Sequence, residues 1–231
     1  MISRVFLLAV TLLISFKSYS LEDMYFSVPV FPPYTQLDSD ALPSGIGTDA
    51  VKQVLDSMGV NYTITISSNH GRALQEVRKQ HSDGFFMASQ NSERDKYAEF
   101  SEPLMSNRWV WVIRQENAHN FNPSDQLFKN QSTVASLLNT NTHHWLKVSG
   151  YTSVYAATSV RGLKDKLDSG AITAILIAEM TFLDTVSEIR DYEIILEEEK
   201  EFGLYISKHF LSDNPGFMYK LNKAIRTYRE Q

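Results

Sequence analysis

The sequence predicts an α/β protein of two lobes, each a mostly parallel sheet flanked by helices, with two crossover strands joining the lobes. Strand-like and helix-like segments alternate along the chain, a pattern that forms parallel sheets covered by helices on both faces. This alternation occurs once in each half of the chain. Two strongly β-prone segments, 108–114 and 202–206, have no helical pattern beside them, and we interpret them as the crossover strands.

The first half of the chain supplies the elements of one lobe. Residues 24–30 have the pattern of a strand, which Pro32 and Pro33 end because proline cannot continue a central strand. Apolar residues at helical spacing predict a helix over 48–58, with Thr48 as its N-cap. A strand over 62–66, a short helix over 72–80 and a buried strand over 84–88 are expected to follow.

The second half repeats the alternation. Asn214 and Pro215 suit the N-cap and the first position of a last helix. The acidic run 197–201 is interpreted as a solvated loop. The other expected strands are 132–136, 154–157, 173–177 and 192–196, and the other expected helices are 143–148 and 160–170.

Two crossovers make the first lobe discontinuous. We therefore expect lobe 1 to comprise 21–110 and 205–231, and lobe 2 to comprise 111–204. Residues 1–20 are expected to be a signal peptide, since their apolar run is shorter than the roughly 20 residues that span a bilayer. Small residues precede the expected cleavage site after Ser20, and a retained membrane anchor is the alternative.

Charge and composition exclude several classes of function. Without residues 1–20 the chain has 20 basic and 27 acidic residues, whereas nucleic-acid binders carry a basic surface. The chain has no cysteine, so disulfides and thiolate metal sites are excluded. The adjacent His143 and His144 would point in different directions on a helix, so we expect no metal site and no cofactor.

The strongest candidate site follows the buried strand 84–88. Ser89, Asn91 and Arg94 lie just beyond this strand, and ligands of open α/β sheets bind beyond the carboxyl ends of strands. A guanidinium binds a carboxylate in bidentate geometry and stays charged when it is buried. The pattern therefore indicates a site for a small anion, and the alternative is an ordinary surface ion pair between Arg94 and an acidic neighbour.

This stretch resembles the family 3 extracytoplasmic solute-binding proteins, which have the type II periplasmic binding protein fold and serve importers of polar amino acids. The residues that match the family's pattern are Asp83, Ser89, Asn91, Glu93, Arg94, Phe100, Ser101 and Pro103. The loop from Phe31 to Tyr34 resembles the family's first loop, whose aromatic residue stacks on the ligand. The resemblance thus implies that Phe31 or Tyr34 lies in the cleft.

The resemblance implies further binding residues in both lobes. His70 stands where the family has an aromatic residue two positions before an arginine, which is Arg72 here; a surface histidine is the alternative. Asn139, Thr140 and Asn141 occupy the positions of the family's Gly-Thr-Thr element. There, hydroxyl and backbone N–H groups meet the ligand carboxylate at a helix N-terminus.

One departure from the family concerns the amino group of the ligand. The family's acidic residue that binds the ligand ammonium falls on Ala178, and a methyl group cannot pair with a buried cation. The adjacent Glu179 is a candidate to serve instead. Otherwise the ligand has no α-ammonium group, or the site no longer binds.

The resemblance implies a monomeric, non-enzymatic periplasmic protein. It would close around one small polar ligand, an amino acid or a related carboxylate, and dock on an ABC permease or a sensor. Two alternatives stay open: a sensing or interaction module whose cleft no longer binds, and a dehydratase or glycan-cleaving enzyme on the same fold. Glu179 and His70 are the only acid–base candidates for such an enzyme.

Overall fold

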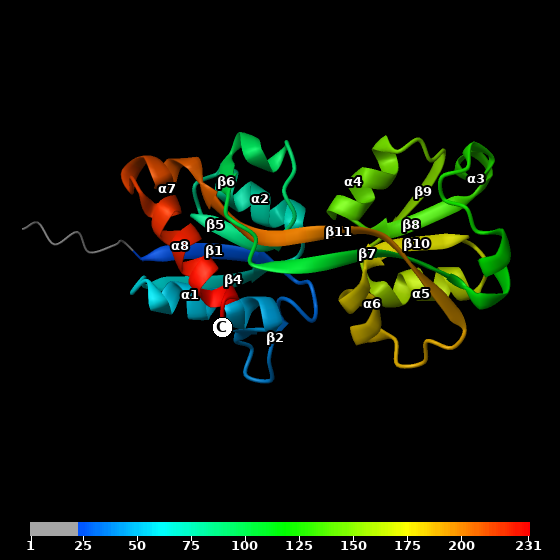
Figure 1. The fold of residues 1–231 in the computed structure, drawn as a ribbon, viewed down its shortest axis with the longest axis horizontal. Coiled ribbons are helices and arrows are strands. Elements are labelled where there is room, and N and C mark those ends of the chain that lie inside the picture. Colours follow the sequence, from blue (N-terminus) through cyan, green and yellow to red (C-terminus); the bar gives the residue numbers. More distant parts are fainter. Residues whose placement is uncertain (1–22) are drawn as a thin grey trace, which may run out of the picture.

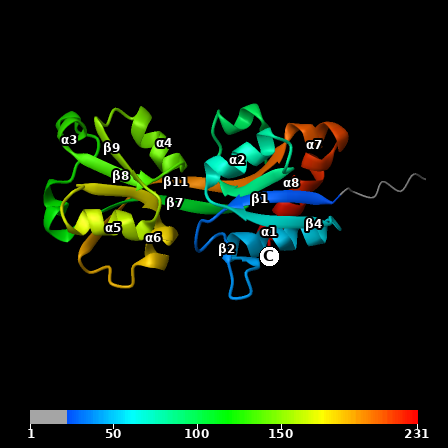
Figure 2. The same ribbon diagram turned by 180° about the vertical axis from the view of Figure 1, so that it is seen from behind.

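The computed structural model describes residues 23–231, which form two lobes connected by two long strands (Figures 1 and 2). The expected signal peptide, 1–20, lies outside the described residues. The expected fold class is confirmed, because each lobe contains a mostly parallel sheet with helices on both faces. Within the described residues, no helix combines the length and the apolar character that crossing a bilayer requires.

The first lobe is built on three parallel strands in the order β4-β1-β5. Helix α2 covers one face of this sheet, and helices α1 and α8 cover the other (Figure 1). Burial on both faces explains the apolar character of β1 and β5. The elements are β1 (Met24–Pro29), β2 (Gln36–Leu37), β3 (Pro43–Ser44), α1 (Ile46–Ser57), β4 (Tyr62–Ser67), α2 (His70–Arg78), β5 (Gly84–Ala88), η1 (Arg94–Lys96), β6 (Ala98–Phe100), α7 (Lys208–Asp213) and α8 (Phe217–Arg229).

The second lobe repeats this arrangement with parallel strands in the order β10-β8-β9. Helix α4 packs on one face of its sheet, and α5 and α6 pack on the other (Figure 1). Leu146 belongs to the core under α4, whereas Leu163 and Phe182 belong to the core under α5 and α6. The elements are η2 (Gln115–Asn120), α3 (Gln126–Gln131), β8 (Thr133–Leu137), α4 (Asn141–Val148), β9 (Ser153–Ala157), α5 (Val160–Asp168), β10 (Ala174–Ala178) and α6 (Glu179–Thr185).

The two crossover strands are β7 (Met105–Arg114) and β11 (Tyr192–Ser207), which pair antiparallel along most of their length. The acidic run 197–201 belongs to β11, so the expectation of a solvated loop was wrong. The segments 192–196 and 202–206 are likewise parts of one strand. A strand can hold these charged residues because the side chains of 197–201 are exposed or partly exposed. In addition, Glu197 accepts a hydrogen bond from Trp111 Nε1 at 2.6 Å. The division of the chain at 110/111 and 204/205 stays a prediction, since both points lie inside continuous strands.

Helix α1 starts without the cap that was expected. Helix α1 begins at Ile46 rather than at Thr48, which is fully buried and caps nothing. Backbone N–H groups of its first turn donate instead to the carbonyl oxygens of Pro33 and Tyr34, at 3.0 to 3.1 Å. Carbonyl groups thus replace a capping side chain. These bonds also fix the loop that follows β1 against the start of α1.

The C-terminal region also differs in its helices. Asn214 ends the additional helix α7, where its side-chain amide donates to the carbonyl oxygen of Phe210 at 3.1 Å. Helix α8 starts after Gly216, whose φ of 84° is accessible to glycine without strain. The predicted N-cap and first position at Asn214 and Pro215 were therefore wrong. Leu221 and Ile225 are buried on the inner face of α8.

Candidate functional site

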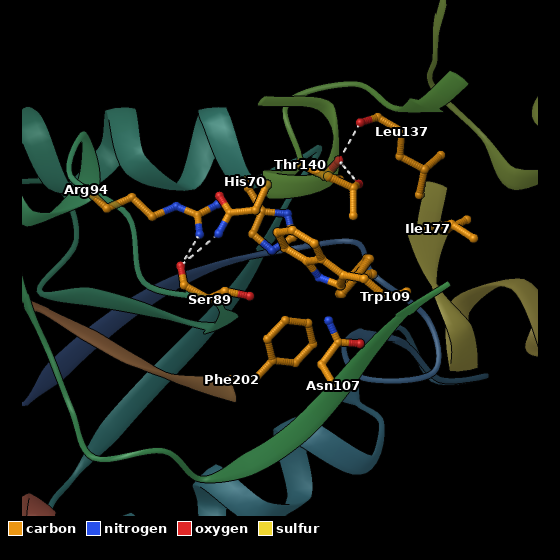
Figure 3. Close-up of a pocket in the computed structure, with 13 residues that line it drawn as sticks. His70, Ser89, Arg94, Asn107, Trp109, Leu137, Thr140, Ile177 and Phe202 are labelled. Carbon is orange, nitrogen blue, oxygen red and sulfur yellow. Dashed lines mark hydrogen bonds between the residues drawn. The ribbon is translucent and has the colours of Figure 1, made fainter. Parts of the chain in front are cut away.

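A cavity lies between the two lobes (Figure 3). The first lobe, both crossover strands and the second lobe all contribute to its wall. Its lining residues are Phe31, His70, Ser89, Arg94, Asn107, Trp109, Leu137, Thr140, Asn141, Thr142, Ile177, Ala178 and Phe202.

Arg94 is the only lysine or arginine in this wall, and its side chain is buried, with 4% of the residue exposed. Its Nη1 donates to the carbonyl oxygen of Ser89 at 2.6 Å, and its guanidinium lies 5.8 Å from the centre of the Phe85 ring. Within residues 23–231, no carboxylate oxygen lies within 4.0 Å of this guanidinium. Burial lowers the pKa of Arg94 to about 10, so the group stays charged at neutral pH without an anionic partner.

The end of β5 directs Ser89 and Arg94 into the cavity. Met87 has a φ of 55°, in the left-handed region that non-glycine residues seldom adopt. Gly47 of α1 lies so close that a Cβ there would sit 2.3 Å from Met87 Sδ. Asn91 Oδ1 then accepts a hydrogen bond from the backbone N–H of Arg94 at 2.9 Å, which holds the start of η1.

His70 occupies the first turn of α2, where its Nε2 lies 3.0 Å from the carbonyl oxygen of Met87. The edge of its ring packs against Phe31, with 5.2 Å between ring centres. Burial, together with the nearby charge of Arg94, lowers the pKa of His70 to about 3. The ring is therefore neutral at pH 7, and Nε2 must carry the proton because it faces a carbonyl oxygen.

The N-terminus of α4 brings the second lobe into contact with the first. Thr140 is its N-cap, and Thr140 Oγ1 accepts a hydrogen bond from the backbone N–H of His143 at 3.2 Å. Asn141 Nδ2 donates to the carbonyl oxygen of Ser89 at 3.0 Å, and Asn141 Oδ1 accepts from Asn91 Nδ2 at 2.6 Å. We call these two interlobe hydrogen bonds the asparagine bridge.

Several residues predicted from the sequence lie together in this cavity. They come from the loops after β1 and β5, from α2 and from η1 in the first lobe, and from the start of α4 in the second. The predicted residues that line it are Phe31, His70, Ser89, Arg94, Thr140 and Asn141.

The other predicted residues surround the cavity or lie away from it. Tyr34 stacks behind Phe31, at 5.4 Å between ring centres, and Asn91 belongs to the asparagine bridge. Asn139 adopts a φ of 62°, and its Nδ2 donates to Asn69 Oδ1 across the lobes at 3.4 Å. None of these three side chains lines the cavity.

Arg72 and Glu179 are each engaged in an ion pair elsewhere. The Arg72 side chain is 53% exposed and contacts Glu76 one helical turn later, at 2.9 Å. Both carboxylate oxygens of Glu179 accept hydrogen bonds from Arg108 Nη1, at 3.0 and 2.8 Å. The sequence placed both residues near the ligand, but neither forms part of the cavity wall.

The crossover strands also contribute to the wall, with residues that were not among those predicted from the sequence. Asn107, Trp109 and Phe202 line the cavity from β7 and β11. A signal was present, because Asn107 is a polar residue between Met105 and Trp109 on a face of β7 that is otherwise apolar. The other lining residues that the predicted set did not include are Leu137, Thr142, Ile177 and Ala178.

Two buried polar groups of the wall have no hydrogen-bond partner in the structure: Ser89 Oγ and Asn107 Nδ2. Buried polar groups are normally paired, so unpaired ones call for an explanation. Together with the guanidinium of Arg94, they equip the cavity with a cation and two further groups able to donate hydrogen bonds. This set is suited to a carboxylate or another small oxyanion.

No metal centre is found in the part of the chain that the structure describes. Residues 23–231 contain no group of three or more histidine, cysteine, aspartate or glutamate side chains arranged to hold a metal ion. His143 is mostly buried beside the backbone N–H of Asn139, which lies 3.3 Å from His143 Nδ1, whereas His144 is exposed. The two histidines therefore do not form a joint site.

Comparison with known proteins gives one family and many similar structures. Residues 26–231 match the sequence model of the bacterial extracellular solute-binding proteins, family 3. A comparison with curated proteins found no match.

Three solved structures illustrate the similarity of the fold. The arginine-bound form of ArgBP from T. maritima is 20% identical, with 88% of this chain and 95% of that chain covered and a TM-score of 0.69. A histidine-bound substrate-binding protein of an ABC uptake transporter from Streptococcus pneumoniae is 15% identical, with 90% and 87% covered and a TM-score of 0.73. A histidine kinase sensor domain is 12% identical, with 91% and 92% covered and a TM-score of 0.77.

Proposed function

The chain belongs to the bacterial extracellular solute-binding proteins of family 3, and we propose that it captures one small solute with a carboxylate group, an amino acid or a related acid, between its lobes. The observation that carries this proposal is the buried guanidinium of Arg94 in the wall of the interlobe cavity, with no carboxylate oxygen of residues 23–231 within 4.0 Å of it.

The energetics of burial support this role for Arg94. A buried charge is strongly disfavoured unless an opposite charge or several hydrogen bonds compensate it. The carbonyl oxygen of Ser89 compensates only part of this penalty, because it is neutral and contacts one nitrogen of the guanidinium. A ligand carboxylate would complete the pairing and would also accept hydrogen bonds from Ser89 Oγ and Asn107 Nδ2, which have no partner within the protein.

The architecture supports capture by closure of the lobes. Arg94 and Ser89 belong to the first lobe, whereas Thr140 and Asn141 belong to the second. A ligand held by both sets would favour the closed arrangement through its differential affinity for it. The crossover strands β7 and β11 are the only continuous connections between the lobes within residues 23–231, so we propose that they contain the hinge.

Membership of this family also supports a proposal for the partner and the location. We propose a monomeric periplasmic protein that delivers its ligand to an ABC permease. The similarity to a substrate-binding protein of an ABC uptake transporter supports this proposal. Delivery to a membrane sensor is the second candidate, supported by the similar fold of a histidine kinase sensor domain.

The positions of the acid–base candidates do not favour an enzyme. His70 has a pKa of about 3 and carries its proton toward the carbonyl oxygen of Met87, which leaves it a weak base at neutral pH. Glu179 is paired with Arg108 outside the cavity wall. A general acid or base needs a pKa near the working pH and access to the substrate.

The proposed function is tested by ligand screening with an arginine variant. Thermal-shift assays against amino acids and small carboxylates should identify stabilising ligands, whose affinities calorimetry then measures. Arg94→Ala should lower the affinity of the tightest ligand by at least about 30-fold, because truncation of a buried charge partner removes about 2–5 kcal/mol. Arg190→Ala is the matched control, since Arg190 is 87% exposed and pairs with Glu188 on the surface. An unchanged affinity in Arg94→Ala would refute the assigned role.

A further inference from the structure

The cavity wall has a positive charge and no negative charge, and this difference favours some carboxylate ligands over others. The wall contains one cation, Arg94, and neither an aspartate nor a glutamate. An amino acid carries a carboxylate and an ammonium group, and each buried charge needs its own partner. The wall supplies Arg94 as a partner for the ligand carboxylate, but it supplies no carboxylate for the ligand ammonium group.

Two neighbouring residues illustrate the missing negative charge. Ala178 lines the cavity at the end of β10 and presents only a methyl group. Glu179 follows directly, but both of its carboxylate oxygens bind Arg108 Nη1, and Glu179 does not line the cavity. Recruitment of Glu179 to a ligand would break this ion pair and leave Arg108 without its closest carboxylate.

Uncharged acceptors around the cavity are also occupied. The carbonyl oxygen of Ser89 already accepts hydrogen bonds from Arg94 Nη1 and Asn141 Nδ2. The carbonyl oxygen of Met87 faces His70 Nε2, and Asn141 Oδ1 accepts from Asn91 Nδ2. An ammonium group has three N–H donors and no acceptor, so it would find few free lone pairs here.

Two groups remain free: Asn107 Nδ2 is a donor only, whereas the hydroxyl of Ser89 can donate or accept. In Figure 3, Arg94 and Ser89 lie on one side of the cavity, whereas Trp109 and Ile177 lie on the other, with the amide of Asn107 between Phe202 and Trp109. The arrangement therefore offers donors to an anionic head and apolar surface to the rest of the molecule.

We infer that the natural ligand is a monocarboxylate with an apolar body and no amino group, such as an oxo acid or a simple carboxylic acid. This inference rests on the proposed function and narrows it to one class of solute. The carboxylate lies against Arg94 and Ser89, and the apolar body lies toward Trp109 and Ile177. An oxygen at the head of the ligand, either of the carboxylate or of an adjacent oxo group, accepts the hydrogen bond of Asn107 Nδ2.

Matched compounds separate the two ligand classes. One set is L-leucine, α-ketoisocaproate and isocaproate, and the other is L-phenylalanine, phenylpyruvate and hydrocinnamate. Within each set the body is the same and only the amino group is changed. Calorimetry on the wild-type protein should show that at least one of the deaminated acids binds at least about tenfold more tightly than its amino acid.

Two variants test whether the absence of a carboxylate in the cavity wall causes the preference for ligands without an amino group. Ala178→Asp places a carboxylate in the wall and should reverse the preference toward the amino acid. Glu179→Gln is the neighbouring control and should leave the preference unchanged, since Glu179 serves Arg108. If Ala178→Asp does not fold, the wild-type comparison and Glu179→Gln still decide the question.

Each outcome has a distinct meaning. Equal or tighter binding of the amino acids by the wild-type protein would overturn the inference and leave the proposed function intact. A loss of amino-acid binding in Glu179→Gln would also overturn it, because Glu179 would then bind the ammonium. If neither set nor any other small carboxylate bound, the proposed function and the inference would both fail.

Discussion

At the residue scale, burial has opposite effects on the two ionisable groups of the cavity. Arg94 keeps its charge because its intrinsic pKa is so high that burial lowers it only to about 10. His70 loses its charge because its ordinary pKa is near 6.5 and the same burial, with Arg94 nearby, lowers the pKa to about 3. The cavity thus holds a single positive charge at neutral pH, and the neutral ring of His70 serves as packing surface for Phe31.

His70 should make the stability of the protein depend on pH. Its pKa is depressed in the folded state, so between pH 6.5 and about 3 the unfolded chain binds more protons than the folded one. The free energy of unfolding should therefore decrease as the pH falls through this window, with a contribution of up to about 1.4 kcal/mol per pH unit. Above pH 6.5 this contribution is constant.

The test is denaturant unfolding of the wild type and of His70→Gln at a series of pH values. The glutamine amide can still donate to the carbonyl oxygen of Met87, but it does not titrate. The variant should show a shallower decrease in stability below pH 6.5. Identical slopes in both proteins would show that His70 is not buried and neutral as described.

The residues of the first lobe were easier to predict than those of the crossovers. Ser89 and Arg94 follow a buried strand, so their place at the carboxyl edge of a sheet is a consequence of local sequence. Asn107 and Phe202 enter the cavity only because two distant strands pair side by side. The polar Asn107 is a local signal, but the place of both residues in the cavity depends on pairing between distant segments, which a local pattern does not encode.

At the element scale, the start of α4 is the part of the second lobe that meets the first. Asn141 forms both hydrogen bonds of the asparagine bridge, to Asn91 and to the carbonyl oxygen of Ser89. The bridge therefore acts on the loop that also positions Arg94. It stabilises the closed arrangement of the lobes by contacts within the chain, in addition to any contact with a ligand.

Removal of the bridge should shift the lobes toward an open arrangement. Asn141→Ala deletes two hydrogen bonds of about 1 kcal/mol each, which corresponds to roughly a tenfold or larger change in the ratio of open to closed molecules. Small-angle X-ray scattering should detect a larger radius of gyration for this variant than for the wild type. Asn130→Ala is the control, because Asn130 lies in α3 and its contacts stay within the second lobe. Equal radii in all three proteins would contradict this role of the bridge.

Whether a segment forms a helix or a strand was predicted more reliably than the residues at which it begins and ends. Apolar periodicity identified α1, α2 and α5 because each has one buried face. It failed for the start of α1, where backbone carbonyl groups replace a capping side chain. It also failed for β11, where the acidic run 197–201 pairs with β7 although its composition is typical of a loop.

At the scale of the whole molecule, the cavity belongs to neither lobe alone. Arg94 belongs to the first lobe, Thr140 to the second, and Trp109 to a strand that continues from one into the other. Binding at such a site depends on both lobes at once, so ligand affinity, lobe closure and folding stability are linked.

This linkage predicts a ligand-dependent increase in stability. At a free concentration one hundred times its Kd, a ligand that binds only the folded state raises the free energy of unfolding by about 2.7 kcal/mol. Denaturant titrations with the tightest acid should show this increase in the wild type and lose most of it in Arg94→Ala at the same ligand concentration. An equal increase in both proteins would indicate binding that does not involve Arg94.

The central claim is that the guanidinium of Arg94 binds the carboxylate of the captured solute, and the crystal structure of a complex tests it most directly. Crystals grown with the tightest-binding acid of the screen should show its carboxylate oxygens about 2.7–2.9 Å from guanidinium nitrogens of Arg94, with the lobes closed over it. A ligand carboxylate bound elsewhere, with Arg94 contacting only the carbonyl oxygen of Ser89, would contradict the claim.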